Sequence, residues 1–267
     1  MEKLLIANRG EIAVRVARAA RELDIATVAV CSEADVDAVH VRFADEHVVL
    51  GPAPATKSYL NQDALLEAAE SVSADAVHPG YGFLSENADF AERVAKSGMT
   101  WVGPAAEAIR LMGDKAQARA TAEEAGVPTV PGSDGSVADL GVAEAVAEAV
   151  GYPVAIKAAA GGGGRGIRVA GSPQELAGQL PVAQAEASAA FGSPEVYIER
   201  FMPRAKHIEV QVFGDGSNFI HMGARDCSMQ RRRQKVIEEA GDLGLPDTVT
   251  DAMTRAAVDL AGSVKYR

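Results

Sequence analysis

The sequence predicts an α/β fold that opens with a parallel, doubly wound sheet. Over roughly the first 100 residues, short apolar runs alternate with amphipathic segments of helical spacing, which is the order expected when helices connect parallel strands. The later part of the 267-residue chain departs from this alternation. There a run of glycines lies between two β-prone segments and a hairpin pattern follows it, so we expect an α+β region with antiparallel strands.

Each element of the first part follows from hydrophobic spacing. Residues 3–7 form a continuous apolar run, which is typical of a parallel strand buried on both faces. In residues 12–23, apolar side chains recur every three or four positions, which predicts a helix. The next strand completes a βαβ unit, whose crossover should be right-handed. The remaining predicted strands cover 27–31, 46–51, 75–78 and 100–103, and the remaining helices 61–71 with Asn61 as N-cap, 89–96 and 105–112.

The second part is assigned in the same way. Residues 127–136, rich in proline, glycine and serine, are typical of a linker. Residues 206–213 alternate as a strand does, and 214–217 form the turn from which the chain returns through 218–222. The other predicted elements are the helices 114–126, 140–150, 173–191 and 248–264 and the strands 154–157, 167–169 and 194–202.

The glycine run follows a strand that ends in Lys157. Backbone N–H groups of such a loop can form a concavity that binds anions, and a neighbouring lysine adds a charge suited to phosphate. The Walker pattern is excluded because no Lys-Ser/Thr pair follows the glycines. Gly161, Gly163 and Gly166 fit the dinucleotide fingerprint, but that fingerprint must open a helix, whereas residues 167–169 predict a strand. A flap over nucleotide phosphates and a plain flexible hairpin are the interpretations that remain.

Two other cationic features point toward an anion. Lys115 falls in the first turn of a predicted helix, where the helix dipole disfavours a cation unless an anion lies nearby. Four cations fall within the five positions 231–235, although the chain as a whole is acidic. An anion site would require such a concentration of charge, and a solvated basic loop is the alternative.

A loop at residues 79–87 follows the strand 75–78. In open α/β sheets, ligands bind beyond the carboxyl ends of the strands. Tyr81, placed between two glycines, could stack on a flat ligand there. Alternatively, Tyr81 and Phe83 cover the core, and the sequence leaves both possibilities open.

Composition narrows the class of protein. The apolar content of 48% supports a sizeable core, and a net charge of −11 disfavours non-specific binding of nucleic acid. Cys31 and Cys227 are far apart, no C-x-x-C pair exists, and we expect two reduced thiols and no metal site. The sequence contains no stretch of 18 apolar residues and no signal-peptide layout, so we expect a cytoplasmic protein without membrane contact.

Ordered motifs run through nearly the whole chain. They are 6–13 (IANRGEIA), 51–54 (GPAP), 57–60 (KSYL), 78–87 (HPGYGFLSEN), 110–115 (RLMGDK), the glycine run, 207–211 (HIEVQ) and 225–235 (RDCSMQRRRQK). Together they resemble biotin carboxylase, as a free subunit or as the N-terminal part of acetyl-CoA, propionyl-CoA and pyruvate carboxylases. The resemblance implies a Rossmann-like domain over 1–113, the flap lobe of an ATP-grasp fold with its linker over 114–202, and the start of the large ATP-grasp lobe over 203–267.

The implied reaction uses ATP, Mg²⁺ and bicarbonate. Bicarbonate attacks the γ-phosphate to give carboxyphosphate, and the carbon dioxide released from it carboxylates N1 of biotin on a carrier protein. The implied partners are that carrier, a carboxyltransferase component and a second copy of the chain in a homodimer. A nucleotide tetraanion and an anionic co-substrate need lysines and backbone donors converging on them, which agrees with the residues noted above.

The resemblance also assigns roles to residues. Lys235 would be catalytic and bind bicarbonate or carboxyphosphate, and Tyr81 would lie near the biotin ureido ring. The implied nucleotide contacts are Lys115 and Lys157 to phosphates, Gly163 and Gly164 through flap N–H groups, Glu199, Arg200, Phe201 and Met202 as a hinge around adenine and ribose, and His207, Gln230 and Arg233 near the ribose.

The sequence departs from the family pattern in two ways. Arg233 stands where the family usually has histidine, and Gly241-Asp242 replace a proline-bearing continuation. Family members also continue past Arg267 into strands that carry the metal-binding glutamates, so we expect an N-terminal fragment that lacks Mg²⁺ ligands and carboxylase turnover. The alternatives are another ATP-grasp carboxylate ligase and a non-catalytic nucleotide-binding or assembly module.

Overall fold

The computed structural model describes residues 1–159, 167–231 and 234–267, and of Lys115, Ala116 and Phe191 the backbone only. Packing divides the chain into unit 1, Met1–Arg110 together with Arg267, and unit 2, Leu111–Tyr266. Within the described residues, no helix is both long enough and apolar enough to cross a membrane. The lobe boundaries at residues 113 and 202 stay a prediction.

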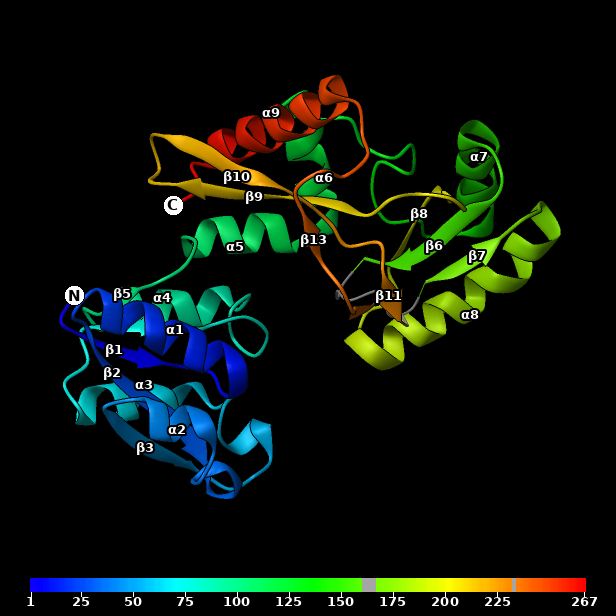
Figure 1. Ribbon diagram of the computed structural model, residues 1–267. Coiled ribbons are helices and arrows are strands. Elements are labelled where there is room, and N and C mark those ends of the chain that lie inside the picture. The colour runs from blue at the N-terminus through cyan, green and yellow to red at the C-terminus, as the bar shows by residue number, and fades with distance from the viewer. Residues whose placement is uncertain (160–166, 232–233) are drawn as a thin grey trace. The chain divides into compact units, whose positions relative to one another are not determined.

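Unit 1 is built on a five-stranded parallel sheet in the order β3-β2-β1-β4-β5 (Figure 1). The order reverses between β1 and β4, as in a doubly wound sheet. The strands are β1 (Lys3–Ile6), β2 (Ala26–Ser32), β3 (Glu46–Gly51), β4 (Ala76–His78) and β5 (Thr100–Trp101). The helices are α1 (Gly10–Glu22), α2 (Val39–Phe43), α3 (Gln62–Ser71) and α4 (Ala88–Lys96), with two short 3₁₀ turns, η1 (Glu33–Asp35) and η2 (Ala55–Lys57). α5 (Ala106–Gly113) contains the division between the units.

Helices cover both faces of this sheet. Leu5 of β1 belongs to the cluster formed with α3 and α4, whereas its neighbours Leu4 and Ile6 pack with α1 on the other face. Successive side chains of a strand point to opposite faces, so a continuous apolar run is what a sheet covered on both faces requires. Asn61 caps α3 as expected, because its side chain accepts a hydrogen bond from the Ala64 N–H. The parallel α/β prediction is confirmed.

Unit 2 contains small antiparallel sheets. The strands are β6 (Val154–Ala158), β7 (Arg168–Ala170), β8 (Val196–Arg200), β9 (Ile208–Gly214), β10 (Phe219–Asp226), β11 (Gln230–Arg231), β12 (Gln234–Lys235) and β13 (Glu239–Ala240). The helices are α6 (Lys115–Glu124), α7 (Leu140–Val150), α8 (Pro173–Phe191) and α9 (Asp247–Ser263). The sheet orders among the described residues are β7-β6-β8, β13-β10-β9 and β11-β12.

The glycine run connects antiparallel strands, since β6 pairs antiparallel with β7. A strand and not a helix follows the glycine run, as the sequence predicted. The dinucleotide fingerprint is therefore excluded, because it must open a helix. α7 and α8 cover one face of this sheet, where Ile156, Leu176 and Ile198 are fully buried (Figure 1). The opposite face of the β7-β6-β8 sheet is not covered by these two helices.

The region after β9 differs from its prediction. The returning strand was expected to end at residue 222, but β10 continues to Asp226. A register shift between His221 and Ala224, next to Gly223 at φ 89°, interrupts the alternation that a strand prediction relies on. The described part of the basic segment is also not a plain loop, because β11 and β12 pair within it.

Candidate active site

Lys157 lies on the face of the β6 sheet that α7 and α8 leave open. It stands directly opposite Tyr197 in the strand register, whereas Val196 and Ile198 point into the core. The Lys157 ammonium forms an ion pair with Glu199 and lies 6.0 Å from the centroid of the Tyr197 ring. The two charged side chains are 25% and 17% exposed, so solvent screens this pair less than a surface pair.

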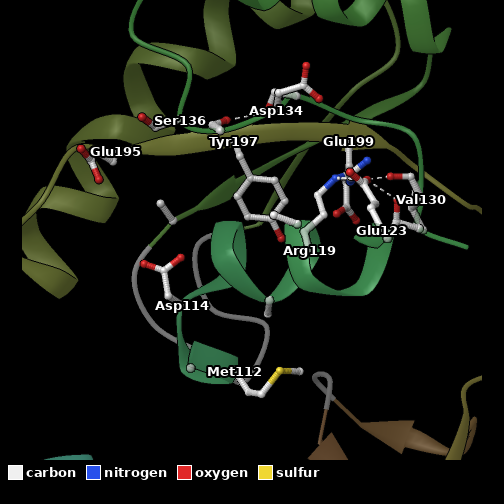
Figure 2. Close-up of a pocket in the computed structure, with 17 residues that line it drawn as sticks. Met112, Asp114, Arg119, Glu123, Val130, Asp134, Ser136, Glu195, Tyr197 and Glu199 are labelled. Atoms are coloured by element: carbon white, nitrogen blue, oxygen red, sulfur yellow. Dashed lines mark hydrogen bonds and ion pairs between the residues drawn. The ribbon is translucent and has the colours of Figure 1, made fainter. Parts of the chain in front are cut away.

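A cavity of about 910 Å³ adjoins this face. It lies within unit 2, between α6, the segment around 129–136, and the ends of β6 and β8. Figure 2 shows the Tyr197 ring reaching from β8 toward α6, with Arg119 and Glu199 beside it. The volume is in the range of pockets that take small molecules and cofactors. Ala159, the last described residue before the glycine run, also lines the cavity.

The polar wall of the cavity is fixed by its own contacts. Arg119 donates to the Val130 carbonyl at 2.5 Å and lies 3.0 Å from a carboxylate oxygen of Glu123. Burial, with the charge of Glu199, raises the pKa of Tyr197 to about 12, so its hydroxyl is neutral at physiological pH. The sequence prediction missed Arg119, and the available signal was its place one helical turn after Lys115.

Lys235 lies in a second polar cluster, on β12. Its ammonium bonds to Glu209 of β9 and lies 3.9 Å from Glu238. Glu209 is also bonded by Arg225, which stands directly opposite it on β10. Burial alone would raise the pKa of Glu209, but the bonds from Lys235 and Arg225 lower it, while Glu209 raises the pKa of Lys235.

The structure brings His207 and Gln230 together. The Gln230 side-chain nitrogen lies 2.5 Å from Nδ1 of His207 and donates to the Cys227 carbonyl at 3.0 Å. The His207 N–H donates to Ser228 Oγ at 2.8 Å. These bonds join the start of β9 to the segment before β11, and they place two predicted nucleotide ligands side by side.

The predicted hinge, Glu199 to Met202, leaves the end of β8. The Arg200 N–H donates to the Pro131 carbonyl and the Phe201 N–H to the Pro153 carbonyl, both at 2.8 Å. The Met202 side chain is exposed. The hinge backbone is therefore tied to the neighbouring segments before any ligand arrives.

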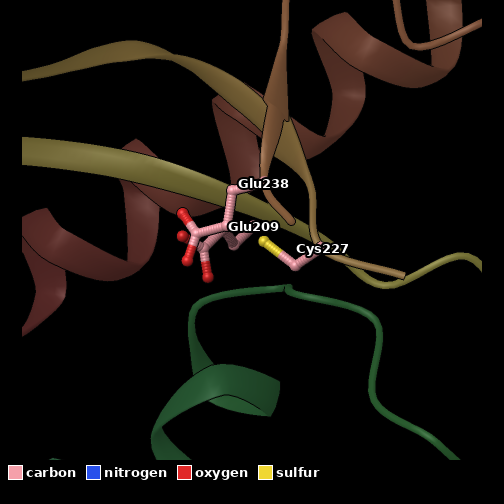
Figure 3. Close-up of side chains that lie close together, drawn as sticks. All are labelled: Glu209, Cys227 and Glu238. Atoms are coloured by element: carbon pink, nitrogen blue, oxygen red, sulfur yellow. The ribbon is translucent and has the colours of Figure 1, made fainter. Parts of the chain in front are cut away.

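Glu209, Cys227 and Glu238 form the one group in the described residues whose ligand atoms all lie within 4.8 Å of one another (Figure 3). Their contacts do not favour a metal. Both carboxylates already face the cations Lys235 and Arg225. Burial, with the charge of Glu209, raises the pKa of Cys227, so a thiolate ligand is disfavoured. The cluster is an ion-pair network.

Tyr81 lies in unit 1, at the carboxyl edge of the sheet. Asn8 holds this loop by donating to the Pro79 and Tyr81 carbonyls at 2.7 and 2.9 Å. Tyr81 is 59% exposed, whereas Phe83 stacks on the buried Tyr59 with ring centroids 5.2 Å apart. Phe83 therefore covers the core and Tyr81 does not. The role of Tyr81 toward biotin stays a prediction.

Some predicted residues cannot be placed in this geometry. Gly163, Gly164 and Arg233 lie outside the described residues. Lys115 begins α6, but its side chain is not among those described. Their assigned roles stay predictions.

A parallel-sheet unit followed by antiparallel strands, with a lysine beside a cavity, is the arrangement expected of an ATP-grasp fold. Residues 1–109 match the family described as biotin carboxylase, N-terminal domain, and residues 114–267 match carbamoyl-phosphate synthase L chain, ATP binding domain. The chain is 55% identical to a biotin carboxylase from Pseudomonas aeruginosa, over 100% of this chain and 60% of that one.

Two solved structures are also similar. A biotin carboxylase–beta-gamma-ATP complex from Campylobacter jejuni superposes with a TM-score of 0.95 at 46% identity, over 100% of this chain and 60% of that chain. The biotin carboxylase domain dimer of a 2-oxoglutarate carboxylase from Hydrogenobacter thermophilus, in complex with MgADP, ADP and bicarbonate, gives 0.93 at 46% identity, over 99% and 58%. The chain therefore consists of a biotin carboxylase N-terminal domain followed by an ATP-grasp domain. It spans about 60% of the length of these three relatives.

Proposed function

We propose that this chain carries the nucleotide- and bicarbonate-facing residues of a biotin carboxylase, which carboxylates biotin on a carrier protein with ATP and bicarbonate. The observation that carries the proposal is the placement of Lys157. It lies on the open face of the β6 sheet, paired with Glu199 of the cavity wall and four positions before Gly161, the first residue of the glycine run. A cation and a glycine-rich backbone at one place suit the phosphates of a nucleotide.

The residues of unit 2 would act by positioning and by charge. Lys157 would bind a phosphate group, and the segment Glu199 to Met202 would hold the base and ribose, with His207 and Gln230 nearby. Lys235 would hold the bicarbonate. Fixed cations around a developing anion lower the barrier to phosphoryl transfer without rearrangement during the reaction.

Mg²⁺ would neutralise charge on the phosphates of the bound nucleotide. It prefers several oxygen ligands, and the one acidic cluster in the described residues includes a thiol and is already paired to cations. The described residues therefore do not fit a magnesium site, and our proposal routes no step through the metal.

We also propose a homodimer, a biotin carrier protein and a carboxyltransferase component as partners, and the cytoplasm as the location. The Hydrogenobacter thermophilus relative, whose name mentions a dimer, supports the homodimer by similarity.

Calorimetric titration with ATP, with and without magnesium, tests the proposed nucleotide site. We expect the chain to bind ATP and Lys157→Ala to bind about ten- to a hundredfold more weakly, the range expected for a lost charge-assisted bond. Lys96→Ala is a matched control, because it removes an exposed lysine from α4 in unit 1. Unfolding curves check that both variants fold. Equal affinity of a folded Lys157→Ala would contradict the proposal.

A second candidate is an ATP-grasp ligase that phosphorylates a different acid. The observation that favours this second function is the match of residues 114–267 to the carbamoyl-phosphate synthase L chain, ATP binding domain. Phosphate release measured with a panel of small carboxylic acids in place of bicarbonate and biotin separates the two functions. Release that depends on one such acid, and not on bicarbonate, would favour the second.

A further inference from the structure

We propose that Arg225 is a positioning residue that shares the Glu209 carboxylate with Lys235 and so keeps Lys235 available for an anionic substrate. The inference deepens the proposed function, on which the identity of that anion depends. Arg225 itself need not touch the substrate.

The cross-strand register fixes the geometry of this pair. Arg225 on β10 stands directly opposite Glu209 on β9, and its Nη2 bonds to Oε1 of that carboxylate. The same Nη2 also donates to Gln211 Oε1 on that strand, at 3.1 Å. Alternate residues of a strand share a face, so Glu209 and Gln211 together hold the guanidinium over the sheet.

The other carboxylate oxygen of Glu209 accepts a hydrogen bond from Lys235. The Lys235 ammonium bonds to Oε2, so the two cations divide one carboxylate between them. Glu238 completes the group, with its oxygens 3.7 Å from Arg225 Nε and 3.9 Å from Lys235 Nζ. Two carboxylates and two cations balance, and the Cys227 thiol beside them has a raised pKa.

This balance has a consequence for anion binding. An anion that binds Lys235 draws the ammonium away from the Glu209 carboxylate that it now faces. Glu209 is 24% exposed, and leaving such a carboxylate without a partner is costly. Arg225 bonds to the other oxygen of the Glu209 carboxylate. Glu209 therefore remains paired when the Lys235 ammonium binds a substrate anion. Without Arg225, Glu209 would be left to Lys235 alone and would compete with the anion.

The direct test is the pKa of Lys235, measured by NMR on the chain with ¹³C-methylated lysines and assigned with Lys235→Gln. Among the residues that the structure describes, the charged groups facing Lys235 are Glu209 and Glu238, with the neutral Cys227 thiol, and Arg225 acts on Lys235 through these two carboxylates. Removing the cation in Arg225→Gln should raise the Lys235 pKa above its wild-type value, because Glu209 then pairs with Lys235 alone. Arg225→Lys should leave it near the wild-type value. A variant that merely loosened the sheet would lower it.

Lys206→Gln is the matched control. It removes a cation from the same end of the sheet, where Lys206 pairs with Asp226 at 3.5 Å, outside the network. It should not move the Lys235 pKa. An unchanged or lowered Lys235 pKa in Arg225→Gln would overturn the inference.

The second readout is affinity for bicarbonate, followed by NMR of the ¹³C-labelled anion. We expect Arg225→Gln to bind about tenfold more weakly or worse, as for loss of a charge-assisted bond, and Arg225→Lys to restore most of the affinity. Equal affinity in Arg225→Gln would contradict the inference even where ATP binds normally. Failure of the wild-type chain to bind ATP would instead count against the proposed function, and the Lys235 pKa would still decide the role of Arg225.

Discussion

The central strands of unit 1 and the strands that carry Lys235 in unit 2 use their faces in different ways. β1 and β2 are buried on both faces, and their side chains are almost all apolar. β9 and β10 pack α9 on one face, and their other face holds the Arg225–Glu209 pair together with exposed apolar side chains such as Phe213 and Ile220 (Figure 1).

This contrast shows that strands covered on both faces contribute mainly to stability, whereas strands with an open face can carry the charged groups that act on a ligand. Where both faces are covered, burial of apolar surface gives most of the free energy of folding and the sequence shows a simple apolar run. Where one face is open, charged groups can meet a ligand, and each one needs a partner in the meantime. The ion pairs of Lys157 and Lys235 supply those partners.

Truncation of the buried sheet should have the largest effect. Leu5→Ala removes a side chain that is fully buried in β1, and we expect it to lower the free energy of unfolding by about 2–5 kcal/mol through lost burial and a residual cavity. Phe213→Ala on the open face of β9, where the ring is 65% exposed, should change it by less than about 0.5 kcal/mol. Urea unfolding measures both. Equal losses would show that the two strands do not differ as described.

The second-largest effect is expected from the hydrogen bond between Tyr59 and Asp35 inside unit 1. The Tyr59 hydroxyl donates to Asp35 at 2.6 Å, and this bond, with Ser32 and Arg9, lowers the pKa of Asp35 against the opposing effect of burial. Since the folded pKa lies below the ordinary value of 3.8, the stabilisation is complete above pH 3.8 and is lost as the pH falls through the lowered pKa.

Asp35→Asn should therefore cost about 1.5–3 kcal/mol near neutral pH, the range for hydrogen bonds to charged groups, and much less in acid. Unfolding curves recorded from pH 7 to pH 2 measure the difference. A cost that stays constant over this range would show that the charge of Asp35 contributes nothing.

The loop of Tyr81 offers a smaller effect. Gly80 has φ +65°, and an added Cβ would lie 2.7 Å from Nδ2 of Asn8, the side chain that holds this loop. Gly80→Ala should cost about 1–2 kcal/mol for the left-handed backbone alone and should loosen the loop. Gly98→Ala, at φ +82° with open space around it, is the control that carries the backbone cost without the clash. Equal losses in the two variants would remove Asn8 from the explanation.

Much of the fold could be predicted from residue patterns. The strand at 46–51 and the helices at 140–150 and 173–191 match their predicted bounds, because a buried run or a helical period is a local property. The helix α2 was not predicted, since five residues are too few to show a period. The extension of β10 was missed because a bulge breaks the alternation in the sequence.

The cations of the candidate site could be predicted from the sequence, but the acidic residues that pair with them could not. Lys157 and Lys235 stood out beside the glycine run and in the basic segment. The bond of Lys157 to Glu199 depends on the register between β6 and β8, and the bond of Lys235 to Glu209 joins strands of two different sheets. The bonded residues are 42 and 26 positions apart in the sequence. Arg225 was noticed only within a motif, since its importance lies in facing Glu209 across two strands.

We propose nucleotide binding in unit 2, whereas unit 1 holds two of the three hydrophobic clusters of the described residues. Hydrogen–deuterium exchange with and without MgATP tests this division most directly. We predict slower exchange on adding nucleotide in peptides that contain Val154–Ala158 and Val196–Arg200, with the strands β1 to β5 unchanged. Protection confined to unit 1, around the amino end of α1, with unit 2 unaffected, would contradict nucleotide binding in unit 2.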